Sequence, residues 1–480
     1  MRICMASDFF FPSIGGVEEH IFNLSQILLS HGHKVIVITH SYGDRTGIRY
    51  MTNGLKVYYL PITVFYNQCI LPTMVCNIPL LRCILLREQI DIVHGHSAFS
   101  ALAHEAMLIG KLLGLRTVFT DHSLFGFADL SAVVTNKFLE ISLSTCNHCI
   151  CVSHIGKENT VLRARVHKDK VSVIPNAVDT AHFTPDPTKR PQDGTINIVV
   201  ASRLVYRKGI DLLAALIPRF KRMTNINFII AGEGPKRDTL EEVREKANMQ
   251  ERVEIVGSVE HSKVRDILVR GHIFVNTSLT EAYCMAIVEA ASCGLQVVST
   301  CVGGIPEVLP SNLIILTDPE VDSIYEGILK AISRLNLSKP DMNGHVINAE
   351  GKHSMTNGSI GKKLGKNFKK LKGKTLQQKP TASKIINNDD AVLCPFRCNE
   401  IVASLYNWEN VTQRTEKVYQ RILNESDPTL GEKLVAVLHS GVWPYLIVVS
   451  LCHLLLMFME YIRPRRLIER AREFPRKSTK

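Results

Sequence analysis

Short apolar runs alternate with amphipathic stretches from residue 2 to about residue 335. The runs are rich in Val and Ile, which is typical of buried strands, and the stretches between them carry apolar residues at helical spacing. Alternation at this pitch predicts parallel sheets covered by helices on both faces. Strands predicted for the first half include Ile3–Ala6, Val35–Thr39, Ile92–His94, Thr117–Thr120 and His148–Val152.

A segment rich in proline and turn residues, 176–195, interrupts this alternation. Such composition favours a linker between domains. The sequence therefore predicts an α/β fold with two Rossmann-like, doubly wound domains, at residues 1–175 and 196–338. Ligands of such folds bind at the carboxyl ends of the strands, so we expect the site in a cleft between the domains.

Residues 339–399 have no hydrophobic period and form a predicted Lys-rich, disordered insert. Between Lys339 and Lys384 there are eleven lysines and two acids, which accounts for nine of the twelve net positive charges. The basicity thus belongs to the insert, and we predict no nucleic-acid partner. A helical pattern resumes afterwards and predicts a closing helix at 400–425.

An uncharged apolar run from Leu434 to Met459 lies near the end of the chain. About 20 such residues are enough to span a bilayer, so we predict a transmembrane helix at 434–461. A buried core helix is the alternative. A basic tail at 462–480 follows. The thirteen cysteines are scattered, many in apolar runs, and indicate a reducing compartment.

The segment 277–294 predicts a helix from about Ala282 to Cys293. Ser278 and Thr280 are candidate N-cap residues, and Gly294 suits the position after the last turn. The free N–H groups and the positive end of the helix dipole would then face the cleft, where they suit a diphosphate.

Two acids, Glu281 and Glu289, belong to this segment. Glu289 lies among apolar residues, where a carboxylate needs a partner, and a ribose diol is one candidate. Glu281 precedes the helix, near the expected place of a sugar. The alternative is that Glu281 is solvated and that Glu289 pairs with a core arginine.

Arg203 and Lys208 follow the first predicted strand of the second domain. Cations at this place can neutralise the charge that develops on a nucleoside diphosphate leaving group. No Asp-x-Asp motif occurs in the chain, so we expect side chains rather than a metal ion to supply the positive charge. A solvated basic loop is the alternative.

The first domain offers glycines and histidines at strand ends. Gly15 and Gly16 allow the backbone to approach a phosphate or sugar closely, although a tight turn would also explain them. His122, His94 and His96 each lie at or just after a predicted strand and so at the cleft rim. Histidines at such places are structural in the alternative interpretation.

In their order along the chain, these residues resemble the retaining GT-B glycosyltransferases of family 4. The resemblance covers residues 2–335 and returns at Tyr406–Leu423. The motifs that carry it are Gly15-Gly16, His122, Ile174-Pro175-Asn176-Ala177-Val178-Asp179, Arg203 with Lys208-Gly209, Glu281 with Glu289, and Gly303-Gly304-Ile305-Pro306-Glu307-Val308.

One part of the chain narrows the resemblance. Many family members carry two glycines directly after the acid that corresponds to Glu281. Here Ala282-Tyr283-Cys284 stands in their place, and this variant resembles the same segment in catalytic subunits of the PIG-A type. Tyr406–Tyr419 and the predicted membrane helix fit the same type. This resemblance implies transfer of N-acetylglucosamine from UDP-GlcNAc to phosphatidylinositol, the first step of glycosylphosphatidylinositol (GPI) anchor synthesis. It implies other subunits and no cofactor.

The resemblance also implies roles. Arg203 and Lys208 would hold the diphosphate, Glu289 the ribose, and Glu281 and His122 the sugar, in a metal-independent reaction with retention. The expected place is the endoplasmic reticulum membrane, crossed once, with the catalytic domains in the cytosol and the tail in the lumen. Two alternatives are a mannosyltransferase acting on a lipid-linked acceptor and an inactive GT-B scaffold subunit.

Overall fold

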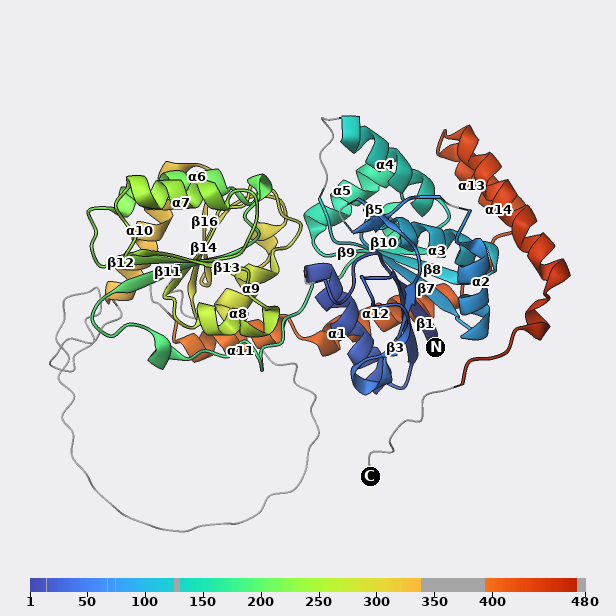
Figure 1. Ribbon diagram of the computed structural model, residues 1–480, viewed down its shortest axis with the longest axis horizontal. Coiled ribbons are helices and arrows are strands. Elements are labelled where there is room, and N and C mark those ends of the chain that lie inside the picture. The colour runs from blue at the N-terminus through green and yellow to red at the C-terminus, as the bar shows by residue number, and fades with distance from the viewer. Residues whose placement is uncertain (14, 67, 74, 125–129, 338–392, 473–480) are drawn as a thin grey trace, which may run out of the picture.

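The structure is a computed structural model that describes residues 1–472 except 14, 67, 74, 125–129 and 338–392. Two α/β domains lie side by side, and the helices after residue 392 connect them and flank the first domain (Figure 1). Most of the predicted insert at 339–399 and the end of the predicted tail lie outside the described residues.

The first domain has an eight-stranded sheet in the order β10-β9-β8-β7-β1-β2-β4-β3, parallel except for the edge strand β3. The five predicted strands agree with β1, β2, β7, β8 and β9 to within one residue at most ends. The strands are β1 (Arg2–Ala6), β2 (Lys34–His40), β3 (Gly47–Tyr50), β4 (Lys56–Leu60), β7 (Ile92–His96), β8 (Arg116–Asp121), β9 (His148–Cys151) and β10 (Val171–Val173), and a small hairpin pairs β5 (Val64–Tyr66) with β6 (Cys69–Ile70).

Both faces of this sheet are covered, as parallel sheets require. Along β1 the side chains alternate between the faces. Ile3 and Met5 pack into the core that includes α1, whereas Cys4 and Ala6 pack into the core that includes α2 and α3. The helices are α1 (Gly16–Ser30), α2 (Ile78–Arg87), α3 (Ala101–Leu112), α4 (Leu130–Leu143) and α5 (His154–Ala164).

The second domain has a six-stranded parallel sheet in the order β13-β12-β11-β14-β15-β16. Its strands are β11 (Ile196–Ala201), β12 (Ile226–Ala231), β13 (Val253–Gly257), β14 (Ile273–Asn276), β15 (Gln296–Thr300) and β16 (Ile314–Thr317). The helices that follow them are α6 (Ile210–Leu216), α7 (Arg237–Lys246), α8 (His261–Leu268), α9 (Met285–Ser292) and α10 (Val321–Leu337).

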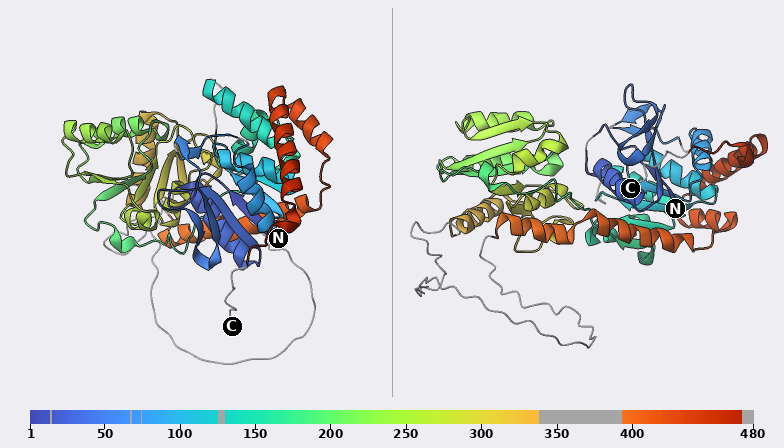
Figure 2. Two further views of the ribbon diagram at one scale, coloured as in Figure 1. Left: turned by 45° about the vertical axis from the view of Figure 1, so that its right-hand side comes forward. Right: turned by 90° about the horizontal axis from the view of Figure 1, so that it is seen from below.

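Two helices, α11 (Pro395–Leu405) and α12 (Trp408–Leu423), lead back from the second domain to the first along one side of the molecule (Figure 2, right). Val402 on α11 lies in the core around α9, and Tyr419 on α12 lies in the core around α1. The predicted closing helix at 400–425 is therefore two helices. The first begins inside the predicted insert, where disorder was expected, because apolar contacts with α9 order it.

The apolar run near the end of the chain is also broken into two helices, α13 (Leu430–His439) and α14 (Trp443–Ile462). The prediction of one helix over 434–461 was wrong at its start, because Gly441 adopts a φ of 73° that ends α13. α14 has 20 residues, is apolar and long enough to cross a membrane, and most of its side chains are not buried in the protein. Near its end, Arg82 on α2 pairs with Glu460 at 2.5 Å.

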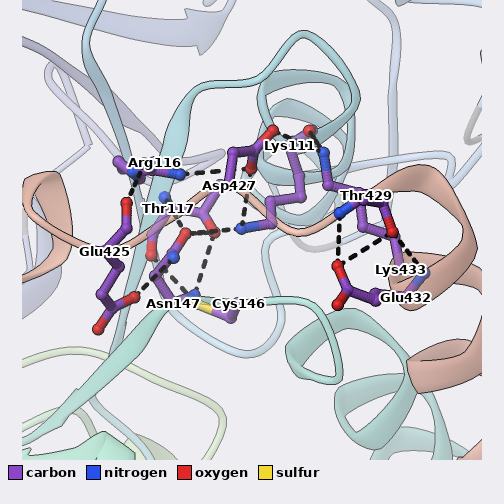
Figure 3. Close-up of polar contacts among 10 residues, drawn as sticks. All are labelled: Lys111, Arg116, Thr117, Cys146, Asn147, Glu425, Asp427, Thr429, Glu432 and Lys433. Carbon is purple, nitrogen blue, oxygen red and sulfur yellow. Dashed lines mark hydrogen bonds and ion pairs between the residues drawn. The ribbon is translucent and has the colours of Figure 1, made fainter.

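The connection between α12 and α13 is bound to the first domain by a network of charged and polar groups (Figure 3). Asp427 accepts hydrogen bonds from Lys433 at 3.0 Å and from Arg116 at 3.3 Å. Lys433 also donates to the carbonyl of Lys111 at 3.0 Å, and the Lys111 ammonium donates to Asn147 at 2.9 Å. The segment that leads to α14 is thus fixed to the first domain.

Candidate active site between the two domains

The loop from β14 to α9 carries Glu281, and its conformation differs from the prediction. α9 begins at Met285, not near Ala282, and its N-cap is Cys284 at a φ of 69°. Ser278 and Thr280 are therefore not N-caps, and the predicted helix start was wrong by about one turn. Instead, the Ser278 hydroxyl lies 2.8 Å from Oδ1 of Asn276 and 3.0 Å from Oε1 of Glu281, and this contact fixes the Glu281 carboxylate ahead of α9.

Lys208 reaches Glu281 from a neighbouring loop after β11, and the two form an ion pair. The loop holding Lys208 is fixed by its backbone, because the Thr277 hydroxyl donates to the Lys208 carbonyl at 2.9 Å. Gly209 makes this close approach possible, since a Cβ there would lie 1.8 Å from the Thr277 carbonyl oxygen, and its φ is 65°. Two residues predicted separately are thus in direct contact.

Arg203 lies on the same loop and is exposed. Its side chain makes no hydrogen bond or ion pair with the part of the chain that the structure describes. Partial loss of hydration around its guanidinium, together with the charge of nearby Arg207, lowers the pKa of Arg203. The charges of Glu18 and Glu281 oppose this shift. A guanidinium remains charged at neutral pH, so Arg203 is a free cation beside the Lys208–Glu281 pair.

Glu289 lies in α9 and is buried, with 5% of its surface exposed. Its partner is not the core arginine of the alternative interpretation but a histidine. Nε2 of His261, at the start of α8, donates to Oε1 of Glu289 at 3.0 Å. The same nitrogen lies 3.2 Å from Oε2 of Glu19 on α1 of the other domain.

Histidines gather at the carboxyl ends of β7 and β8. Nδ1 of His96 lies 3.3 Å from Nε2 of His122, and the two rings are stacked. His94 Nδ1 lies 2.7 Å from the hydroxyl of Tyr419, and the ring of His20 contacts that of His122. Burial lowers the pKa of His122 well below 6.5, and His20 and His94 add to this. His122 is therefore a neutral hydrogen-bonding group at physiological pH.

The glycine pair of the first domain faces the second. A Cβ on Gly16 would lie 3.9 Å from the side chain of Met285, the first residue of α9. Gly15 is the extended N-cap of α1, and the carboxylate of Glu18 lies against it. The structure therefore brings the glycines opposite the helix start that was predicted to face a diphosphate, together with an acid that was not predicted there.

Close backbone packing within the second domain lies behind Glu281. A Cβ on Gly303 would lie 2.1 Å from the Glu281 carbonyl oxygen, and one on Gly304 would lie 2.1 Å from that of Ala282. Leu124 of the first domain packs on Gly303 as well. These two glycines are needed because the loop carrying Glu281 passes directly over them.

Glu307, in the same motif, ties the second domain to a helix of the first. Its carboxylate accepts hydrogen bonds from the backbone N–H groups of His154 at 2.6 Å and Ile155 at 2.9 Å, at the start of α5. An acid is favourable at a helix N-terminus because unpaired N–H groups and the helix dipole attract negative charge.

Four residues of this region, Glu18, Glu19, His261 and Glu307, were not among the predicted site residues. A signal existed for each of them, and Glu307 belongs to a motif already named in the sequence. Glu18 and Glu19 directly follow the glycine pair, and His261 opens a helix just after a strand end, which is where site residues of such sheets lie. The pairing of residues between domains could not be inferred from one chain's periodicity.

Comparison with known proteins gives two family matches. Residues 40–129 match the family described as PIGA (GPI anchor biosynthesis), and residues 185–340 match Glycosyl transferases group 1. The second match contains Arg203, Lys208, Glu281 and Glu289.

Full-length relatives and a solved structure agree. A human protein named as a subunit of phosphatidylinositol N-acetylglucosaminyltransferase is 50% identical over 98% of this chain and 87% of its own length. The Arabidopsis thaliana protein of the same name is 46% identical over 98% and 94%. Sucrose-phosphate synthase from Thermosynechococcus elongatus superposes with a TM-score of 0.63 at 16% identity, covering 88% of this chain and all of that one. The predicted GT-B fold is confirmed.

Proposed function

The chain belongs to the PIGA family of phosphatidylinositol N-acetylglucosaminyltransferase subunits, and we propose that it performs the transfer itself. It moves N-acetylglucosamine from UDP-GlcNAc to phosphatidylinositol, the first step of GPI-anchor biosynthesis. The likeness over 98% of the chain carries this function. It does not favour a mannosyltransferase or an inactive scaffold.

For the donor, we assign the diphosphate to Arg203, Lys208 and the free N–H groups at the start of α9. Three features support this: the free guanidinium, the ammonium already poised beside Glu281, and the eight-residue helix behind them. Cations and N–H groups fixed at this place stabilise the charge that grows on the leaving diphosphate. The reaction then needs no metal ion to supply that charge.

We assign the sugar to Glu281 and His122 and the ribose to Glu289. Gly15 and Gly16 face the second domain from the start of α1, and a Cβ on Gly16 would contact Met285 at the start of α9. Because His122 is neutral, it can donate or accept a hydrogen bond without adding charge. The leaving diphosphate takes the proton of the acceptor hydroxyl on the face from which it departs, which gives retention at the anomeric carbon.

The protein is a subunit of a membrane-associated, multi-subunit transferase, in keeping with the name of its relatives and with α14. We place it in the endoplasmic reticulum membrane with both catalytic domains in the cytosol. Protease protection on intact microsomes tests this. Digestion of the catalytic domains without membrane lysis is expected, and their protection would contradict the orientation.

The transfer itself is tested with labelled UDP-GlcNAc on microsomes that carry wild-type protein, Glu281→Ala or Lys208→Ala. Both variants should lose labelled phosphatidylinositol product. Unchanged transfer in both would refute the site. Excess GDP-mannose serves as a donor control and should leave the wild-type reaction unaffected.

A further inference from the structure

A group of three side chains spans the two domains beside the proposed ribose site. It contains Glu19 from α1 of the first domain, and His261 and Glu289 from α8 and α9 of the second. A single nitrogen, Nε2 of His261, lies 3.0 Å from Glu289 and 3.2 Å from Glu19. The side chains are 7% exposed for Glu289, 19% for Glu19 and 33% for His261, so the group is shielded but can be reached by a ligand.

The charges of the group favour this shared contact. Burial lowers the pKa of His261, but the hydrogen bond and charge of Glu289, with the charge of Glu19, outweigh it and raise the pKa to about 9. Burial, Glu289 and Asp179 raise the pKa of Glu19 to about 7, against the effect of His261. At neutral pH the imidazole is therefore protonated between two acids. A protonated imidazole has no lone pair, so this state does not ligate a metal ion.

The hydrogen bond leaves the two oxygens of Glu289 different. Oε1 accepts from His261, while Oε2 has no hydrogen-bond donor among the residues that the structure describes. A carboxylate held at one oxygen cannot rotate freely, so the other oxygen has a defined direction. An oriented anionic acceptor is what a ribose hydroxyl needs for a strong, charge-assisted hydrogen bond.

We propose that His261 is a positioning residue for nucleotide recognition, which holds Glu289 so that its free oxygen receives a ribose hydroxyl of the donor. Glu19 completes the arrangement from the first domain, so the ribose is recognised fully only when the two domains are together. The proposal rests on the assignment of the ribose to Glu289 made above. It adds a residue from each domain to the recognition of the donor.

The test compares UDP with 2′-deoxy-UDP, which lacks one ribose hydroxyl, by calorimetric titration of the purified full-length protein. Loss of a hydrogen bond to a charged group weakens binding about 10- to 100-fold, so the wild-type ratio of the two Kd values should be in that range. His261→Ala should bring the ratio close to one, and Glu19→Ala should lower it by a smaller factor. His261→Gln, whose amide N–H can replace Nε2–H, should keep part of the ratio.

The control is His167→Gln, which alters an exposed histidine that also lies beside an acid, 3.3 Å from Asp169. It should keep the wild-type ratio. A purely structural role for His261 would weaken both nucleotides equally in the Ala variant and leave the ratio unchanged, which would overturn the proposal.

Glu289→Gln separates this proposal from the function on which it rests. If the ratio is unchanged in Glu289→Gln, or is near one in the wild type, the assignment of the ribose to Glu289 fails. If Glu289→Gln lowers the ratio and His261→Ala does not, only the role of His261 fails.

Discussion

The two domains contribute different kinds of group to the candidate site. The second domain contributes cations, and its loops are fixed by backbone contacts, as at Gly209 and Gly303. The first contributes glycines, the acids of α1 and buried histidines, and burial lowers the pKa values of histidines such as His96 and His122. In the assignment proposed above, this difference follows from where positive charge is needed. A diphosphate leaving group requires fixed cations on one side, whereas neutral histidines on the other side can recognise hydroxyl groups.

The role of the second domain's cations is tested most directly by Lys208→Met, which removes the ammonium but keeps an unbranched side chain. Removing one group that stabilises developing negative charge typically costs about 100- to 1,000-fold in kcat. We expect a loss of this size in the microsomal transfer assay. The control is Lys236→Met, because Lys236 also pairs with an acid, Asp211 at 2.8 Å, outside the site.

Full activity of both the Lys208 and the Lys236 variant would break the comparison, since the charge of the second domain would then have no special role. A similar loss of activity in both would point to general destabilisation, which a melting curve of each purified variant reveals.

The fixed backbone of the second domain is tested by Gly303→Ala, with Gly43→Ala as a matched control. Both glycines have nearly the same φ, 53° and 54°, so both substitutions impose a similar conformational strain. A Cβ on Gly43 meets nothing within 4 Å, whereas one on Gly303 would lie 2.1 Å from the Glu281 carbonyl oxygen. We expect Gly303→Ala to lower the free energy of unfolding by about 2 kcal/mol more than the control, as overpacking does.

The measurement is the midpoint of thermal unfolding of the full-length protein in detergent, followed by transfer activity at a permissive temperature. Equal midpoints for the two variants would mean that the loop carrying Glu281 can move away from Gly303 at no cost. The rigid description of the second domain would then be wrong.

Much of this arrangement could be predicted from periodicity. The parallel sheets, the linker and the strand-end positions of Arg203, Lys208 and Glu281 follow from local pattern, because apolar runs and loops are properties of neighbouring residues. Gly294 was also predicted correctly, and its φ is 75° after the last turn of α9.

The rest depends on contacts between distant segments. Cys284 became the N-cap of α9 because the loop before it is held by Gly303, Gly304 and the loop of Lys208, which no helix-start pattern encodes. α11 is ordered by packing on α9 across the insert. The partner of Glu289 was missed for the same reason, since His261 is 28 positions away and Glu19 belongs to another domain.

The buried, neutral histidines of the first domain are tested by the pH dependence of protein stability. Burial, with a smaller effect of His20, lowers the pKa of His94 from 6.5 to about 3. Between these values the unfolded chain binds more protons than the folded one, so the free energy of unfolding falls as the pH is lowered from about 6.5. At pH 5.5 this histidine alone should remove about 1 kcal/mol relative to pH 7.5. His94→Gln, which can still bond to Tyr419, should lack that part of the acid destabilisation.

The measurement is the difference between wild type and His94→Gln in unfolding midpoint at pH 7.5 and 5.5. Taking the difference matters because buried carboxyl groups such as Asp8 and Asp121 have raised pKa values and change stability with the opposite sign. His167→Gln, at an exposed site, should follow the wild type at both pH values. A parallel response of His94→Gln would mean that His94 takes up a proton in the folded protein over the same pH range as in the unfolded chain. The histidines of the first domain would then gain charge readily, and the contrast between the two domains would disappear.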